Sequence, residues 1–173
     1  MKKYFSIILI FIISIILVGC GNNNNKQEAN GHIAEENDVS KVKKIVCKLE
    51  KEDTVNSYKL DTTYELTVEN DLVIKNKMTE IITSTNKDTL DYFENYMKST
   101  YKTMNDKYGG YDYKVTNDGK QVASSTTIDY TKTDIEKIIQ DDSSMKLMVN
   151  SNNQVTLAGV KSVYNTLGIA CDD

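Results

Sequence analysis

The sequence predicts an α+β fold in which an antiparallel β-sheet carries helices packed mainly on one face. Three observations support this prediction. Apolar and polar residues alternate in several segments, one long segment repeats apolar residues at every third or fourth position, and strands precede and flank that segment without a regular strand–helix alternation. The last observation argues against a parallel sheet, because parallel strands need a long crossover, usually a helix, between them.

Five segments show the two-residue periodicity of half-buried strands. They are residues 45–50, 58–68, 72–83, 111–116 and 120–130. Asn70-Asp71 separates the second and third segments, and Asn117-Asp118-Gly119 separates the last two. Both linkers have turn-forming chemistry, so each pair is predicted to form an antiparallel hairpin with one face open to water.

Three segments predict helices, from the spacing of their apolar residues and from their start and stop residues. They are residues 86–108, 133–140 and 156–167. We expect Asp88 to cap the long helix and Gly109-Gly110 to end it. Thr156 should cap the last helix, which Gly168 stops. The run 145–149 fits either a helix or a strand and is left unassigned.

The N-terminal residues have the build of a secretory signal, in which Lys2 and Lys3 precede an apolar stretch of fourteen residues, 5–18. This stretch is too short to span a membrane, which takes about 20 residues. Leu17, Val18, Gly19 and Cys20 match the lipobox of bacterial lipoproteins at every position. That resemblance implies a diacylglycerol, with fatty acids such as palmitate, on the Cys20 sulfur and cleavage between Gly19 and Cys20.

Residues 1–19 are therefore expected to be a cleaved signal peptide. Residues 20–41, rich in Asn, Gln, Glu and Lys, are expected to form a flexible, lipid-anchored tether. Residues 42–173 are expected to form a single domain. The predicted location is extracytoplasmic, on the outer face of the cell membrane if the source is Gram-positive.

The charge of the chain argues against nucleic acid as a partner. The formal net charge is −4, and removal of Lys2 and Lys3 with the signal peptide brings it to about −6. Lysines are interspersed with acidic residues instead of clustering on one segment. The expected partners are the membrane, through the lipid on Cys20, and an unidentified envelope protein or small ligand; the sequence leaves the oligomeric state open.

The sequence carries no catalytic motif and indicates no cofactor or metal. Its single histidine, His32, lies in the predicted tether, which argues against His-dependent nucleophiles and His-based zinc sites in the domain. Asp141-Asp142 with Asp129 or Asp134 offers carboxylates for a hard cation or for acid–base chemistry. We favour the alternative that these aspartates belong to a solvated surface, since none sits in a recognisable calcium loop.

Two further sets of residues are candidates for sites. Cys47 and Cys171 would both be exported, and we favour a disulfide between them over two buried thiols. Tyr108, Tyr111 and Tyr113 surround the double glycine and suit a recognition surface, because tyrosine offers rigid, amphipathic contact area. For Tyr111 and Tyr113 a place in the core is an equally good interpretation.

The order of these elements resembles the YehR-like lipoproteins, small bacterial envelope proteins of unknown function. The resemblance runs from Lys44 to Cys171 and rests on four features downstream of the lipobox. They are the 58–83 hairpin, the helix end at 104–110, the segment 126–135 and the final glycine-capped helix. The resemblance implies a lipid-anchored α+β domain with helices against an antiparallel sheet, and it brings no catalytic residues.

Together these observations favour a non-enzymatic binding or accessory module of the cell envelope. The alternative is an enzyme that works through carboxylates alone on envelope material such as a glycan, which would need two acidic side chains about 5 to 10 Å apart in a cleft. A purely structural role in the envelope is the third hypothesis.

Overall fold

A computed structural model of the chain describes residues 42–172. The predicted signal peptide, the lipobox with Cys20 and the predicted tether lie outside the described residues. The described elements follow in chain order. They are β1 (Lys43–Asp53), β2 (Tyr58–Glu69), β3 (Leu72–Ser84), α1 (Lys87–Tyr108), β4 (Tyr111–Asn117), β5 (Gln121–Asp129), α2 (Ile135–Asp141), the 3-10 helix η1 (Ser143–Leu147), α3 (Leu157–Thr166) and β6 (Ala170–Cys171).

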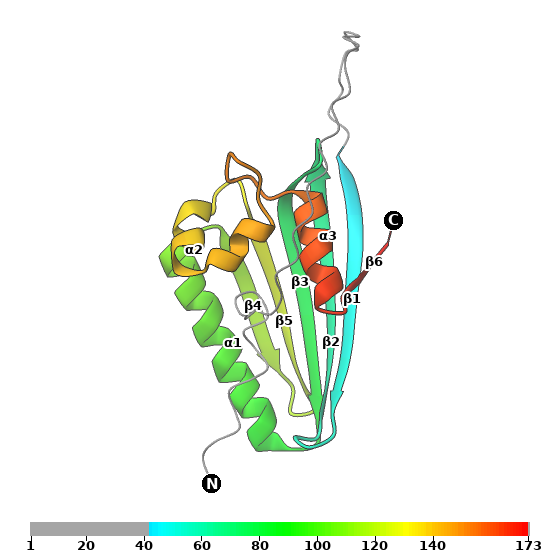
Figure 1. Cartoon of the computed structure of the whole chain (residues 1–173). Coiled ribbons are helices and arrows are strands. Elements are labelled where there is room, and N and C mark those ends of the chain that lie inside the picture. The colour runs from blue at the N-terminus through cyan, green and yellow to red at the C-terminus, as the bar shows by residue number, and fades with distance from the viewer. Residues whose placement is uncertain (1–41, 173) are drawn as a thin grey trace, which may run out of the picture.

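The described strands form one antiparallel sheet in the order β4-β5-β3-β2-β1-β6. β1, β2 and β3 are consecutive neighbours, and α1 then leads the chain to β4 at the far edge (Figure 1). The β4–β5 hairpin returns, and β5 pairs with β3. The predicted α+β class is confirmed.

The two faces of the sheet differ sharply in polarity. The helices lie on one face (Figure 1), where β2 contributes alternate buried residues from Tyr58 to Val68. α1 covers this face with Leu90, Phe93 and Met97, all buried. One ladder row of the opposite face is partly or fully exposed to water. Its members are Lys48, Thr63, Thr79, Ser125 and Lys114.

The start of α1 differs from the prediction. The cap is Asn86, whose side-chain oxygen accepts hydrogen bonds from the backbone N–H groups of Asp88 and Thr89. Asp88 lies in the first turn, where a negative charge is favourable next to the helix N-terminus. The predicted end is confirmed, because Gly109 caps the helix at a positive φ of 69°.

The C-terminal region contains one segment that the sequence left unassigned and one strand that it did not predict. Residues 143–147 form a 3-10 helix, and Val149 then makes an isolated bridge with Val155. After α3, which Thr156 caps as predicted, the two-residue strand β6 pairs with β1. This short strand extends the sheet by one further strand at the edge.

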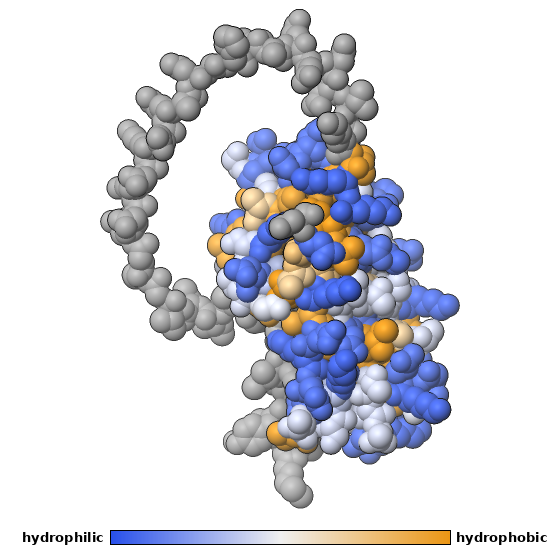
Figure 2. All heavy atoms as spheres, turned by 90° about the vertical axis from the view of Figure 1, so that its right-hand side faces the viewer, coloured by the Kyte–Doolittle hydropathy of each residue, from blue (hydrophilic) through white to orange (hydrophobic). Residues whose placement is uncertain are grey.

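Figure 2 views the domain from the side of β1 and β6. Hydrophilic residues make up most of this surface, and hydrophobic ones gather mainly in its upper half. β6 pairs with β1 only at Cys47 and Lys48. The exposed Glu50 and Lys51 lie beyond this pairing, where β1 forms the edge of the sheet and charge discourages pairing with another sheet. Within residues 42–172, no helix has the length and apolar character needed to span a membrane.

Candidate functional site

Cys47 and Cys171 form a disulfide, as predicted. They are directly paired residues of β1 and β6, and their Cα atoms lie 3.9 Å apart. Cys47 is fully buried, and the backbone N–H of Asp172 donates to the carbonyl of Val46 at 2.8 Å. The bond therefore fastens β6 to β1.

The three tyrosines near the double glycine lie toward the helix-covered side. Tyr108 is 9% exposed, and its hydroxyl donates to Asp141 at 2.9 Å. Tyr111 and Tyr113 extend from β4 and pack half-buried against the core, and burial raises the pKa of Tyr111 above its usual value. The structure thus gives all three a packing role; a binding role for them stays a prediction.

The aspartates considered for metal or acid–base chemistry are engaged in local contacts. Asp129 accepts a hydrogen bond from the Thr131 hydroxyl at 2.6 Å, and Asp141 pairs with Lys107 at 2.8 Å. Asp134 caps α2, and Asp142 caps η1. Hydrogen bonds from Thr131 and Lys107 lower the pKa of Asp129 and Asp141, respectively, whereas a general acid needs a raised pKa. No metal-ligating cluster of three or more His, Cys, Asp or Glu residues occurs in the described part of the chain.

A buried carboxyl that sequence reasoning missed lies at the centre of the sheet. Glu80 of β3 is 8% exposed, and its Oε2 atom accepts hydrogen bonds from the Ser124 hydroxyl at 2.7 Å and from the Tyr101 hydroxyl. Burial raises the pKa of this carboxyl, against the opposing effect of the two hydrogen bonds. The strand pattern contained the signal, because Met78, Glu80 and Ile82 share one face.

Glu80→Gln is expected to raise the free energy of unfolding at about pH 8, because a neutral amide oxygen can accept the same hydrogen bonds without burial of a charge. A raised folded-state pKa means that the stability contribution of Glu80 is full below the unfolded value of 4.5 and is lost as the pH rises through the folded value. The difference between variant and wild type should therefore vanish toward acid pH. Urea unfolding across this pH range measures it.

The matched control for Glu80 is Glu65→Gln, on the water-exposed face of β2. This substitution also removes one carboxylate from the sheet but changes no buried charge, so its effect should be within about 0.5 kcal/mol at every pH. A Glu80→Gln variant that is less stable than wild type at about pH 8 would show that the buried carboxylate is net stabilising.

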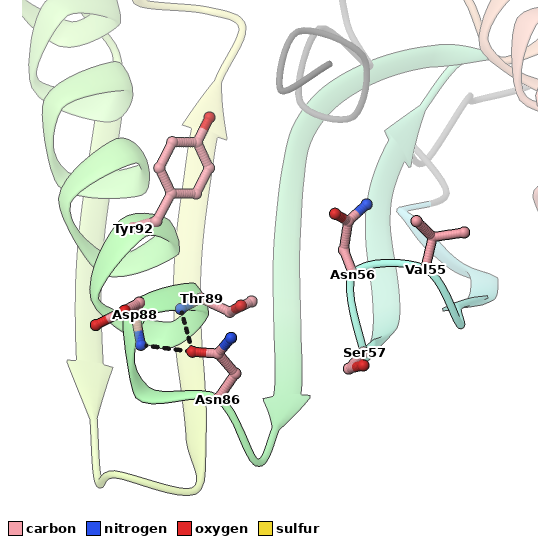
Figure 3. Close-up of a pocket in the computed structure, with 7 residues that line it drawn as sticks. All are labelled: Val55, Asn56, Ser57, Asn86, Asp88, Thr89 and Tyr92. Atoms are coloured by element: carbon pink, nitrogen blue, oxygen red, sulfur yellow. Dashed lines mark hydrogen bonds between the residues drawn. The ribbon is translucent and has the colours of Figure 1, made fainter. Parts of the chain in front are cut away.

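A pocket of about 390 Å³ lies where the β1–β2 turn meets the beginning of α1 (Figure 3). The turn and the start of α1 form opposite walls. The lining residues are Val55, Asn56 and Ser57 from the turn and Asn86, Asp88, Thr89 and Tyr92 from the helix cap and first turns. The volume falls within the range of about 300 to 1,000 Å³ that is typical of small-molecule sites.

Hydrogen bonds hold both walls of the pocket in place. The Asp53 carboxylate accepts from the backbone N–H groups of Val55 and Asn56, at 3.0 and 2.9 Å, and from the Asn56 side chain at 2.8 Å. The buried Ser84 joins the walls, because its hydroxyl donates to the Ser57 carbonyl at 2.7 Å and accepts from the Asn86 N–H at 3.1 Å.

Exposed apolar side chains are concentrated in this pocket. Among residues 42–172, four large hydrophobic side chains are exposed, and two of them, Val55 at 90% and Tyr92 at 39%, line this pocket. They are 37 positions apart in the sequence, Val55 in the β1–β2 turn and Tyr92 in α1. Sequence reasoning missed the pocket because nothing local indicates that the turn and the helix start lie side by side.

Comparisons with known proteins give a fold but no activity. No family model matches the chain, and a search of curated proteins finds no match. The structure is similar to the NMR structure of E. coli YehR, with 19% sequence identity, a TM-score of 0.50, and coverage of 77% of this chain and 92% of YehR. A protein from Streptococcus pneumoniae TIGR4, also solved by NMR, is similar at 10% identity and a TM-score of 0.45, over 89% of this chain and 99% of that one. The similarity to YehR shows that the domain has a YehR-like fold.

Proposed function

We propose that this chain is an extracytoplasmic lipoprotein, anchored through lipid on Cys20, whose domain is a non-enzymatic binding module of the bacterial cell envelope. The observation that carries the proposal is the Cys47–Cys171 disulfide, because disulfides form and persist mainly in oxidising compartments outside the cytoplasm. It agrees with the export expected from the lipobox, Leu17 to Cys20.

The arrangement of the domain supports a binding role at its far end. β1 begins at Lys43, next to the predicted tether, and runs eleven residues to the β1–β2 turn. A strand of this length spans roughly 35 Å. In Figure 1 the start of β1 and the β1–β2 turn lie at opposite ends of the sheet. The pocket therefore lies at the end of the domain opposite the point where the predicted tether joins it.

The pocket supports binding over carboxylate catalysis. Asp88 is the one carboxylate among its seven lining residues. Glycoside hydrolysis by paired acids takes two carboxyl groups on either side of the scissile bond. This pocket lacks the second acid, and we propose that it holds a ligand without transforming it.

Cys20→Ser is expected to abolish lipid attachment. The full chain, expressed in a bacterial host fed with labelled palmitate, should incorporate the label, and its mature N-terminal peptide should carry the mass of a diacylglycerol on Cys20. The Cys20→Ser variant should incorporate none. Cys47→Ala/Cys171→Ala is the matched control, because it removes the other two cysteines and should keep the label. A wild-type chain without label would refute the anchoring proposal.

A further inference from the structure

We infer that the pocket between the β1–β2 turn and the start of α1 binds a neutral carbohydrate, with the Tyr92 ring as its stacking surface. The inference rests on the proposed function and names the ligand class of that binding module. It stands on three properties of the pocket: its exposed apolar side chains, the chemistry of its polar groups and the rigidity of its walls.

The apolar part of the pocket is an exposed aromatic ring held in a fixed position. Tyr92 stacks on Tyr96 with ring centroids 6.0 Å apart and an interplanar angle of 28°, and it contacts Phe93 edge-on at 5.4 Å. Val55 extends from the facing wall (Figure 3). A partly exposed ring held by its neighbours suits the C–H face of a sugar ring, since such contact is apolar and loses little side-chain entropy.

The polar part of the pocket suits hydroxyl groups. Asn56 and Asn86 contribute side-chain amides, Ser57 and Thr89 contribute hydroxyls, and Asp88 contributes one carboxylate. The Asn86 side-chain oxygen caps α1, and its amide nitrogen takes no part in the cap. Hydroxyls donate and accept hydrogen bonds, so a polyhydroxylated ligand can use amides, hydroxyls and a carboxylate alike.

The charge of the lining argues against anionic ligands. No lysine lines the pocket, and Lys87, at the start of α1, pairs with Asp91. The positive N-terminal end of α1 also lies at this wall, but Asp88 in the first turn already offsets it, so a phosphate or carboxylate group would meet the charge of Asp88 without a cation from the lining to neutralise it. A neutral ligand avoids this repulsion, which distinguishes a neutral glycan from acidic envelope polymers.

Hydrogen bonds within the chain hold the walls of the pocket. Asp53 holds the turn through three hydrogen bonds, and Ser84 links the turn to the helix cap. Preorganised groups cost less conformational entropy on binding. These hydrogen bonds therefore favour binding of a small ligand with little loss of conformational entropy.

The test is titration of the mature lipoprotein, held in dodecylphosphocholine micelles that contain no sugar headgroup, with two neutral probes, chitotetraose and maltotetraose. At least one should bind in isothermal titration calorimetry and shift the backbone amide resonances of residues 55–57 and 86–92. Tyr92→Ala should weaken binding at least fivefold, and Tyr92→Phe should stay within about twofold of wild type, because it keeps the ring.

The matched control is Leu147→Ala, which truncates another exposed hydrophobic side chain, 60% exposed, outside the pocket. It should leave the dissociation constant unchanged. The amide spectrum of Tyr92→Ala should retain the dispersion of wild type, which separates lost binding from lost folding.

Three outcomes would overturn the inference. They are absence of binding by both saccharides to the folded, lipidated chain, amide shifts confined to other residues, and unchanged affinity in Tyr92→Ala. A neutral tetrapeptide that shifts the pocket amides where the saccharides do not would assign the pocket to peptide instead. None of these results changes the palmitate label on Cys20, so failure of the carbohydrate inference is distinguishable from failure of the anchoring proposal.

Discussion

Replacement of Cys47 and Cys171 by alanine is expected to lower the free energy of unfolding by about 4 to 5 kcal/mol. The bond joins residues 124 positions apart, and a cross-link over such a length removes conformational freedom mainly from the unfolded chain. A typical domain is stabilised by only about 5 to 15 kcal/mol. The midpoint of thermal unfolding, measured by calorimetry, should therefore fall by roughly 15 °C.

Local structure should respond in the same variant. β6 contains only two residues, and without the disulfide few contacts hold it against β1. Hydrogen exchange should lose protection first at Asp172, whose N–H donates to Val46, and next in α3. The central strands β2 and β3 should keep their protection until the domain unfolds globally.

Reduction of the wild-type protein provides the control for this prediction. Dithiothreitol should lower the wild-type midpoint by about the same amount and leave the double-alanine variant unchanged. The second comparison accounts for Cys20, the remaining cysteine of the chain. Oxidised and reduced wild-type proteins with equal midpoints would show that the bond adds no stability to the fold.

The strands and helices could be predicted from the sequence because their determinants are local. Alternation over residues 58–68 places Leu60, Tyr64 and Leu66 on one face whatever they later contact. Turn residues act in the same way, as Asn70 and Asp71 show with positive φ values of 50° and 60°. The error at the start of α1 is also local, since Asn and Asp both cap helices well.

The arrangement of the site could not be predicted because it depends on contacts between distant residues. The pocket exists only because the sheet brings the β1–β2 turn beside the start of α1, and no pattern in either segment indicates this proximity. β6 could not be predicted either, since two residues are too few to show the alternation of a strand. The Cys47–Cys171 pair is the exception, because cysteine chemistry links residues that are distant in sequence.

Gly110→Ala is expected to destabilise the fold by about 2 to 5 kcal/mol. Gly110 has a φ of +77°, which costs an L-residue about 1 to 2 kcal/mol. A Cβ atom there would lie 2.2 Å from the Thr133 hydroxyl and 2.9 Å from the backbone carbonyl oxygen of Asp129. Relief of the second contact requires movement of the backbone, and overpacking of this kind typically costs about 1 to 3 kcal/mol.

Gly119→Ala is the matched control, because Gly119 also has a positive φ, +82°, but a Cβ atom there would meet no atom within 4 Å. In urea unfolding, Gly119→Ala should lower the free energy of unfolding only by the cost of the positive φ, about 1 to 2 kcal/mol. The additional loss of stability in Gly110→Ala then measures the energetic cost of the close contact between residue 110 and the β5–α2 connection. Thr133→Ala removes the 2.2 Å contact but also the hydrogen bond from the Thr133 hydroxyl to the Asp129 carbonyl. Measured against Thr133→Ala alone, Gly110→Ala should therefore cost less than it does in the wild-type background. Equal losses of stability in Gly110→Ala and Gly119→Ala would mean that the β5–α2 connection moves away from the added methyl group at no cost. The double glycine would then be needed only for its backbone conformation.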